Sequence, residues 1–248
     1  MSVPSKIGTA LICLMGFAPT ASHAGTEQTR EAVLALLEAS RETYGFPGAT
    51  ISVAASDGAV ENFAVGVANT ESQQQMTPTH RMLAASVGKT FWGALILSLE
   101  DDGVLKRRDL VSRHLGSKPW FDRVPNSATI TIDHLLTHSA GVPDHVHMTD
   151  AGQKLIAMGD TGSFDPVDLV ALVFDEPALF PAGEGWTYSD TGYVLLGLAI
   201  EAATGHSPFE LVQKRFLEPL QLTNTLPSRS RTIPGLAAGY TIGENPFG

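Results

Sequence analysis

Ser86 and Lys89 stand three residues apart in the segment AASVGKTF at positions 84–91. At the start of a helix, positions i and i+3 lie on one face, so the lysine amine can reach the serine hydroxyl. A serine hydroxyl is a weak nucleophile until a neighbouring base takes its proton. Lysine can serve as that base where burial lowers its pKa, and the apolar residues 91–97 that follow would bury this helix. The segment therefore predicts a serine nucleophile with a lysine as its base.

The same segment ends in Gly88-Lys89-Thr90, which is also how a phosphate-binding P-loop ends. That loop needs a glycine five residues before Gly88, so that backbone amides can wrap the phosphates, and Leu83 occupies this position. Because the preceding residues also lack the Val- and Ile-rich strand that such a loop follows, we exclude nucleotide binding. Spacing alone does not distinguish a nucleophile from an N-cap serine beside a solvated lysine.

A further segment supports the nucleophile. The sequence FPAGEGWTYSDTGYVLLGLAIEAATG begins at Phe180, and two shorter segments, LLTHSAGVPD (135–144) and LEPLQLTNT (217–225), accompany it. Together they resemble the serine β-lactamase and penicillin-binding DD-peptidase superfamily, and most of all its branch of class C β-lactamases, D-alanyl-D-alanine carboxypeptidases and family VIII esterases. The resemblance extends from about Ala32 to Tyr240.

The resemblance assigns a role to each matching residue. Ser86 and Lys89 match the family's Ser-x-x-Lys motif, in which the serine is acylated and the lysine accepts or relays its proton. Tyr188 matches the tyrosine of the Tyr-x-Asn motif, which passes the proton to the leaving group and helps to activate the deacylating water. Tyr193 lies five residues further on, and we expect it to pack in the core. The resemblance implies a mechanism that uses no metal ion and no cofactor.

Two features depart from the family pattern. Asp190 stands where the family has asparagine, and an ionised carboxylate can only accept hydrogen bonds, whereas an amide also donates. We expect Asp190 to raise the pKa of Lys89 and to weaken recognition of acylamino substrates more than that of simple esters. The family's third motif, Lys-Thr-Gly or His-x-Gly on a C-terminal strand, has no counterpart after Tyr240. We therefore expect a C-terminally incomplete member, and a catalytically inactive or non-enzymatic penicillin-binding homologue is the alternative function.

A metal-dependent hydrolase is a weaker alternative. His145-x-His147 is similar to part of the ligand run of metallo-β-lactamases, but Asp150 is displaced by one position and no histidine follows it. His134 and His138 stand four residues apart and could bind zinc from one helix face. They fall in a segment that is structural in the family, and we expect His138 to be a structural histidine near the rear wall of the site.

The N-terminal residues are typical of a secretory signal peptide. A short basic start is followed by an apolar run over residues 7–18 and by small residues before Gly25, which predicts cleavage after Ala24. Cys13, the single cysteine, lies in this segment, so disulfides and a thiol nucleophile are not expected in the mature chain. We expect a periplasmic or secreted bacterial protein with no stable membrane anchor after signal cleavage.

Composition indicates a soluble globular domain over residues 25–248, with 43% hydrophobic and 17% charged residues. The formal net charge of −10 and the lack of a basic stripe make nucleic acid an unsuitable partner. The expected partner is a small-molecule or peptidoglycan-peptide substrate, and the predicted reaction is hydrolysis of D-Ala-D-Ala-type peptides, β-lactams or esters through a serine acyl-enzyme.

Hydrophobic periodicity predicts the elements that position these residues. It predicts a helix that ends near Gly45, with Val33, Leu36, Leu37 and Tyr44 on one face. Two strands then flank Asp57-Gly58, the strongest short signal for a β-hairpin, and a mainly helical region follows over about residues 86–217. The expected fold is α+β of the β-lactamase/transpeptidase type, an antiparallel sheet flanked by helices, with its C-terminal strands missing.

Overall fold

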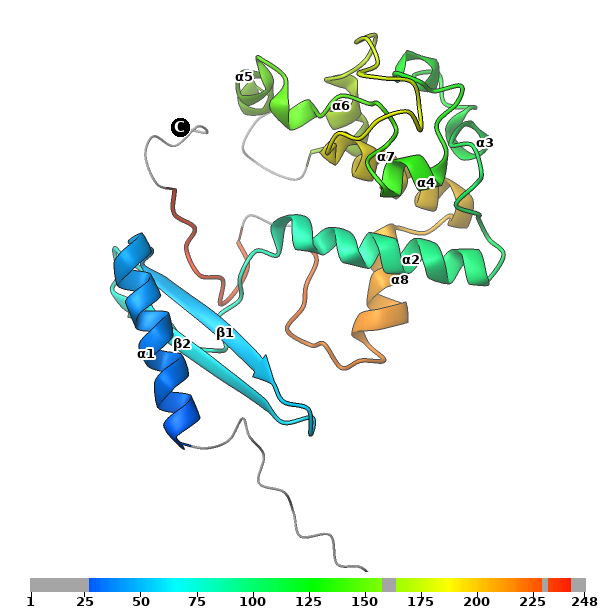
Figure 1. Ribbon diagram of the computed structural model, residues 1–248. Coiled ribbons are helices and arrows are strands. Elements are labelled where there is room, and N and C mark those ends of the chain that lie inside the picture. The colour runs from blue at the N-terminus through cyan, green and yellow to red at the C-terminus, as the bar shows by residue number, and fades with distance from the viewer. Residues whose placement is uncertain (1–26, 158–163, 229–231, 242–248) are drawn as a thin grey trace, which may run out of the picture. The chain divides into compact units, whose positions relative to one another are not determined.

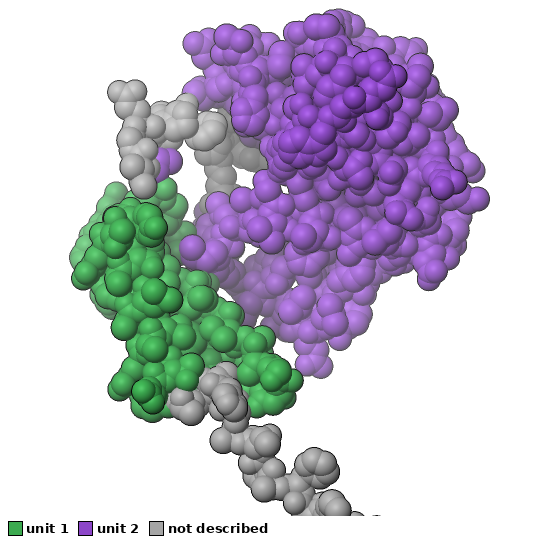
Figure 2. Space-filling model, in the orientation of Figure 1, with its two compact units in different colours: residues 1–80, 237–240 green, residues 81–236, 241–248 purple. Residues whose placement is uncertain are grey.

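The computed structural model describes residues 27–157, 164–228 and 232–241 (Figure 1). The predicted signal peptide lies outside these residues. The chain divides into two compact units, residues 1–80 with 237–240 and residues 81–236 with 241–248 (Figure 2). No helix in the described ranges is both long and apolar enough to cross a membrane.

The first unit is a helix on a small antiparallel sheet. Helix α1 (Glu27–Tyr44) is followed by strands β1 (Gly48–Ala54), β2 (Val60–Asn69) and β3 (Gln74–Gln75), which pair in the order β1-β2-β3. The hairpin predicted at Asp57-Gly58 is present, with Ala54 opposite Val60 in an antiparallel register. Gly58 has a φ of 87°, a left-handed conformation that glycine adopts without steric cost.

The face that α1 turns to the sheet is narrower than the periodicity predicts. Val33 and Leu37 are partly buried, whereas Leu36 and Tyr44 are 70% and 71% exposed. Arg30 also lies on the sheet side, where its guanidinium stacks over Phe63 and pairs with Glu61. The helix is therefore confirmed, but the prediction of one apolar face that includes Leu36 and Tyr44 is wrong: these two side chains are exposed, and Arg30 shares the sheet side with Val33 and Leu37.

The second unit is mainly helical. A 3-10 turn, η1 (Ala85–Gly88), leads directly into helix α2 (Lys89–Asp101). Helix α7 (Asp190–Thr204) begins at the N-cap Ser189, whose side chain accepts the Gly192 N–H, and ends at Gly205 in the left-handed conformation. The other elements are α3 (Ser112–Leu115), η2 (Phe121–Arg123), α4 (Ile132–Leu136), η3 (His145–His147), α5 (Ala151–Ala157), α6 (Pro166–Ala171), α8 (Pro208–Val212) and the π-helical turn η4 (Gln213–Leu217).

The core of this unit forms between α2 and α7, together with α4, α6 and α8 (Figure 1). Helix α7 turns four fully buried side chains inward at helical spacing, and α2 contributes three more; they are Leu195, Leu196, Ala199, Ile200, Leu95, Ile96 and Leu99. This packing fixes the N-termini of both helices in one body. Ser86 and Lys89 lie at one of these ends, and Tyr188 and Asp190 lie at the other.

Candidate active site

Ser86 lies on the turn that precedes α2. The residue before it, Ala85, has a φ of 45°, a left-handed conformation that residues other than glycine seldom adopt. Thr90 Oγ1 donates a hydrogen bond of 2.7 Å to the Val87 carbonyl and so closes the turn. Ser86 is exposed, and Lys89 is the first residue of α2, one turn further on. The predicted Ser-x-x-Lys segment is therefore a turn that leads into a helix.

Two side chains, those of Tyr188 and Lys89, donate to the Ser86 hydroxyl. Tyr188 Oη donates a hydrogen bond of 2.8 Å to Ser86 Oγ, and Lys89 Nζ donates to the same oxygen at 3.4 Å. Lys89 Nζ also forms an ion pair with Asp190 Oδ1, and Tyr188 Oη lies 3.5 Å from that carboxylate oxygen. All four predicted site residues are thus brought together within one unit, by the N-termini of α2 and α7.

Opposing influences act on Lys89. Burial is the largest single influence and lowers its pKa, but hydrogen bonds and charges from Asp190 and Tyr188 act in the opposite direction, and the pKa of Lys89 is raised above its ordinary value. The ammonium lies 4.9 Å from the centre of the Tyr188 ring and 5.4 Å from that of Tyr193, close enough for cation–π attraction. Lys89 is therefore charged at neutral pH, as expected with an aspartate in place of asparagine.

Tyr193 packs against the core, as its position in the helix predicts. Its hydroxyl donates a hydrogen bond of 3.0 Å to the Leu136 carbonyl, and burial raises its pKa. The hydroxyl is thus engaged away from Ser86, and only the ring of Tyr193 faces Lys89.

The histidines considered as metal ligands have other partners. His134 Nδ1 accepts the Thr131 N–H in the capping box of α4. His145 is buried, and both its N–H and its Nδ1 lie 2.9 Å from Thr191 Oγ1. Within the ranges that the structure describes, no three His, Cys, Asp or Glu side chains gather so that they could hold a metal ion.

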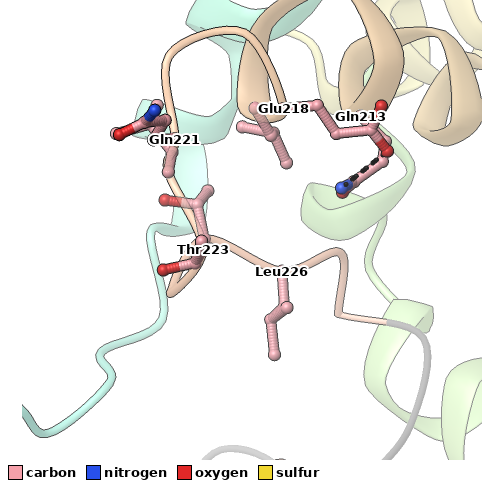
Figure 3. A pocket seen from close by; sticks show the side chains of 8 residues that line it. Gln213, Glu218, Gln221, Thr223 and Leu226 are labelled. Carbon is pink, nitrogen blue, oxygen red and sulfur yellow. Dashed lines mark hydrogen bonds between the residues drawn. The ribbon is translucent and has the colours of Figure 1, made fainter.

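A shallow pocket of about 480 Å³ lies at η4 and the loop that follows it, between Gln213 and Leu226 (Figure 3). Its lining is mixed, with leucines beside glutamine, glutamate and threonine, and Gln213 Nε2 donates a hydrogen bond of 3.4 Å to Glu218, another of the lining residues. Ser86, Lys89, Tyr188 and Asp190 do not line this pocket. It is therefore a separate feature from the Ser86 site.

The chain belongs to the β-lactamase family, since the family model described as Beta-lactamase matches residues 33–246. The superfamily predicted from the sequence motifs is therefore confirmed, and it is a family of hydrolases. The fold is confirmed as well: solved structures of the β-lactamase/transpeptidase type match the chain, which combines a small antiparallel sheet with many helices.

Relatives of three kinds illustrate the family. Penicillin-binding protein 4* of Bacillus subtilis (strain 168) is 28% identical over 221 residues, which are 88% of this chain and 46% of the relative. A D-stereospecific amidohydrolase from Streptomyces sp. has a TM-score of 0.65 at 25% identity, covering 77% of this chain and 55% of that one. The protein SurE, solved with D-Leu, has a TM-score of 0.60 at 31% identity, covering 77% and 40%. The chain thus spans about half the length of these relatives.

Proposed function

We propose that the protein is a serine hydrolase that acts through an acyl-enzyme on Ser86. One observation carries the proposal: Ser86 Oγ lies 2.8 Å from Tyr188 Oη and 3.4 Å from Lys89 Nζ. A hydroxyl within reach of two groups that can take or stabilise its proton is the arrangement of an activated nucleophile. An N-cap serine would instead bond its own helix, and the turn before α2 has no side-chain cap.

The reaction proceeds in two halves. Uncharged Lys89 Nζ takes the Ser86 proton as Oγ attacks the substrate carbonyl carbon. Tyr188 Oη gives its proton to the leaving amine or alcohol as the bond to the carbonyl carbon breaks, which leaves Ser86 acylated, and the resulting phenolate takes the proton held by Lys89. In the second half Lys89 takes a proton from the water that attacks the ester, Tyr188 gives its proton to Ser86 Oγ as the ester bond breaks, and the proton on Lys89 again passes to Tyr188, so that the acid is released and the free serine is restored. No metal or cofactor takes part in either half.

The proposed substrates are D-Ala-D-Ala-type peptides, β-lactams or esters. The relatives support a D-configured residue beside the scissile carbonyl, since one is named as D-stereospecific and another is solved with D-Leu. Asp190 favours esters within this group, because a carboxylate paired with Lys89 cannot donate to the acylamino carbonyl of a peptide or a β-lactam. Comparing nitrocefin with p-nitrophenyl esters tests this preference: Asp190→Asn is expected to raise nitrocefin turnover relative to ester turnover, and an unchanged ratio contradicts it.

Covalent labelling tests the proposed nucleophile. A fluorescent fluorophosphonate is expected to label the wild-type chain and to leave Ser86→Ala dark. Ser56→Ala is the matched control, because Ser56 is an exposed serine on the hairpin turn, and this variant is expected to label like the wild type. Labelling that survives in Ser86→Ala, or a folded wild type that stays dark, contradicts the proposal.

A penicillin-binding protein that is acylated without turnover is the second candidate function. The ion pair between Lys89 and Asp190 favours it, since a lysine held in the charged form is a poor base for deacylation. A chromogenic β-lactam distinguishes the two: a hydrolase gives continued release, whereas a binding protein gives one equivalent and then stops.

We also propose that the protein acts outside the cytoplasm after cleavage behind Ala24. The order of basic, apolar and small residues at the N-terminus supports this location, as does the similarity to a penicillin-binding protein. Cell fractionation with intact-mass measurement tests it. The expected species lacks residues 1–24 and is found in the periplasm or medium, and a full-length cytoplasmic protein contradicts the proposal.

A further inference from the structure

His138 contacts each residue of the segment that carries Tyr188. Its ring stacks on the Tyr188 ring with centroids 4.4 Å apart, and Trp186 meets it edge-on at 6.1 Å. Its carbonyl accepts the Thr187 N–H at 3.0 Å, and its Nδ1 accepts the Ser189 N–H at 3.2 Å. The residues on either side of Tyr188 are therefore held by His138 through the backbone, and Tyr188 itself is held through its ring.

The bond from Ser189 fixes the protonation state of the imidazole. Nδ1 can accept an N–H only when it carries no proton, so the ring is neutral and its hydrogen is on Nε2. A proton on Nδ1 would point at the Ser189 N–H, and two donors would then face each other. Protonation of His138 therefore breaks one of the bonds that hold the Tyr188 segment.

We propose that neutral His138 is a positioning residue for Tyr188, and that its protonation slows acylation of Ser86 by releasing the segment 186–189. The inference rests on the proposed function of Ser86, since acylation is the step that Tyr188 serves. His138 is not a catalytic residue in this account, because it acts on the reacting oxygen only through the tyrosine. Displacement of a reacting group by about 1 Å can reduce a rate by about 100-fold, so loosening of Tyr188 has a measurable effect.

Charged groups on several elements face His138. Burial lowers its pKa, and the positive charge of Lys89 acts in the same direction, while the carboxylates of Asp190 and Asp144 oppose both. The ring also lies 5.2 Å from that of Tyr193, whose hydroxyl bonds the Leu136 carbonyl. The loss of acylation is therefore expected below the ordinary histidine value of about 6.5.

Two substitutions separate the contacts of His138. Its φ of 59° is left-handed, a conformation that asparagine adopts more readily than most residues. His138→Asn keeps an acceptor for the Ser189 N–H and cannot titrate, although it loses the ring. His138→Phe keeps a ring against Tyr188 and loses the acceptor. Neither variant removes a group that reacts with substrate.

The test is the rate constant of fluorophosphonate labelling, measured from about pH 4.5 to about pH 8. This range brackets the ordinary histidine pKa of about 6.5. The wild type is expected to label more slowly at acid pH. His138→Asn is expected to lack this acid decrease, and its rate constant at about pH 7.5 is expected to stay within about 10-fold of the wild-type value. His138→Phe is expected to label about 10- to 100-fold more slowly than the wild type at all pH values. The exposed His147→Asn is the matched control and is expected to keep the acid limb. An acid limb that persists in His138→Asn, or that disappears in His145→Asn instead, overturns the proposal.

NMR titration of the histidine and tyrosine rings tests the positioning role of His138 without an activity measurement. The His138 signals, identified by their loss in His138→Asn, are expected to report the Nε2–H form at neutral pH, and the Tyr188 ring signals to shift at the same midpoint. A histidine that only fills space would titrate without moving Tyr188. A wild type that is not labelled refutes the proposed function, whereas Tyr188 signals that ignore the His138 midpoint refute the positioning role.

Discussion

Replacing Asp190 by asparagine removes the carboxylate that pairs with Lys89 while keeping the size of the side chain. In the wild type this carboxylate helps to hold the pKa of Lys89 above its ordinary value, although burial alone would lower it. In Asp190→Asn burial is opposed only by Tyr188. A larger fraction of Lys89 is then uncharged and free to accept the Ser86 proton, and the ammonium formed by that transfer stabilises negative charge on Tyr188 Oη without a competing carboxylate. Both effects favour acylation.

The size of the change follows from the ion pair. Two unit charges about 4 Å apart attract by about 1 kcal/mol in water and about 4 kcal/mol near a protein surface. The Lys89 and Asp190 side chains are 17% and 31% exposed, so solvent screening weakens the attraction and we take about 2 kcal/mol. This energy corresponds to a fraction of uncharged Lys89 about 30-fold larger at a given pH, because about 1.4 kcal/mol is a factor of ten. Lys89 with a lower pKa is also a weaker base, which offsets part of the increase in its uncharged fraction. We therefore expect Asp190→Asn to be labelled about 5- to 10-fold faster than the wild type.

The assay is the rate of fluorophosphonate labelling at neutral pH, with folding checked by circular dichroism. Asp175→Asn is the matched control, because it removes one carboxylate of an exposed ion pair with Arg123 and changes the net charge equally. This control is expected to label at the wild-type rate. If Asp190→Asn folds normally and labels no faster than the wild type, Asp190 does not restrain Lys89 as a base.

The remaining predictions concern stability. Thr191→Val is expected to cost about 1–3 kcal/mol in urea denaturation, because the buried N–H and Nδ1 of His145 both lose their partner; a loss below 0.5 kcal/mol, roughly the smallest hydrogen-bond contribution, would contradict this. Gly141→Ala is expected to destabilise far more than Gly103→Ala: both have left-handed φ angles of 68° and 72°, but only at Gly141 would an added Cβ lie 2.1 Å from the Phe180 carbonyl. Burial lowers the pKa of His145, so on acidification this histidine is protonated in the unfolded chain before it is protonated in the folded chain. The melting temperature is therefore expected to fall as the pH drops below about 6.5, the ordinary histidine pKa. Equal melting temperatures above and below this pH would contradict the prediction.

Local sequence signals predicted the elements that depend on local chemistry. Asp57-Gly58 predicted the hairpin, because a left-handed glycine is what such a turn requires. The mainly helical region predicted over about residues 86–217 is present, and the structure shows local chemistry of the same kind at α7, where Ser189 is the N-cap and Gly205 is the left-handed residue at the C-terminus. The convergence of Tyr188 on Ser86, across 102 residues, was accessible only through the resemblance to a family, since no local pattern encodes so distant a contact.

Features that depend on tertiary packing were not predicted. The exposure of Leu36 depends on how much of the sheet lies beneath α1, which periodicity does not report. The short helices α3 and α5 span only four and seven residues, too few for a periodic signal. His138 was assigned a structural role, and its stacking on Tyr188 depends on the fold of two segments about 50 residues apart. The part of the site that sequence left open is therefore the shell that orients the reacting groups.

Ser86 is the proposed site of a covalent acyl-enzyme. The most direct measurement is the intact mass of the chain after incubation with a p-nitrophenyl ester or benzylpenicillin and rapid acid quenching, followed by peptide mapping. We expect a mass increase equal to one acyl group, located on the peptide that contains Ser86 and absent from Ser86→Ala. A folded chain that gains no mass with either reagent, or that carries the adduct on another residue, would contradict it.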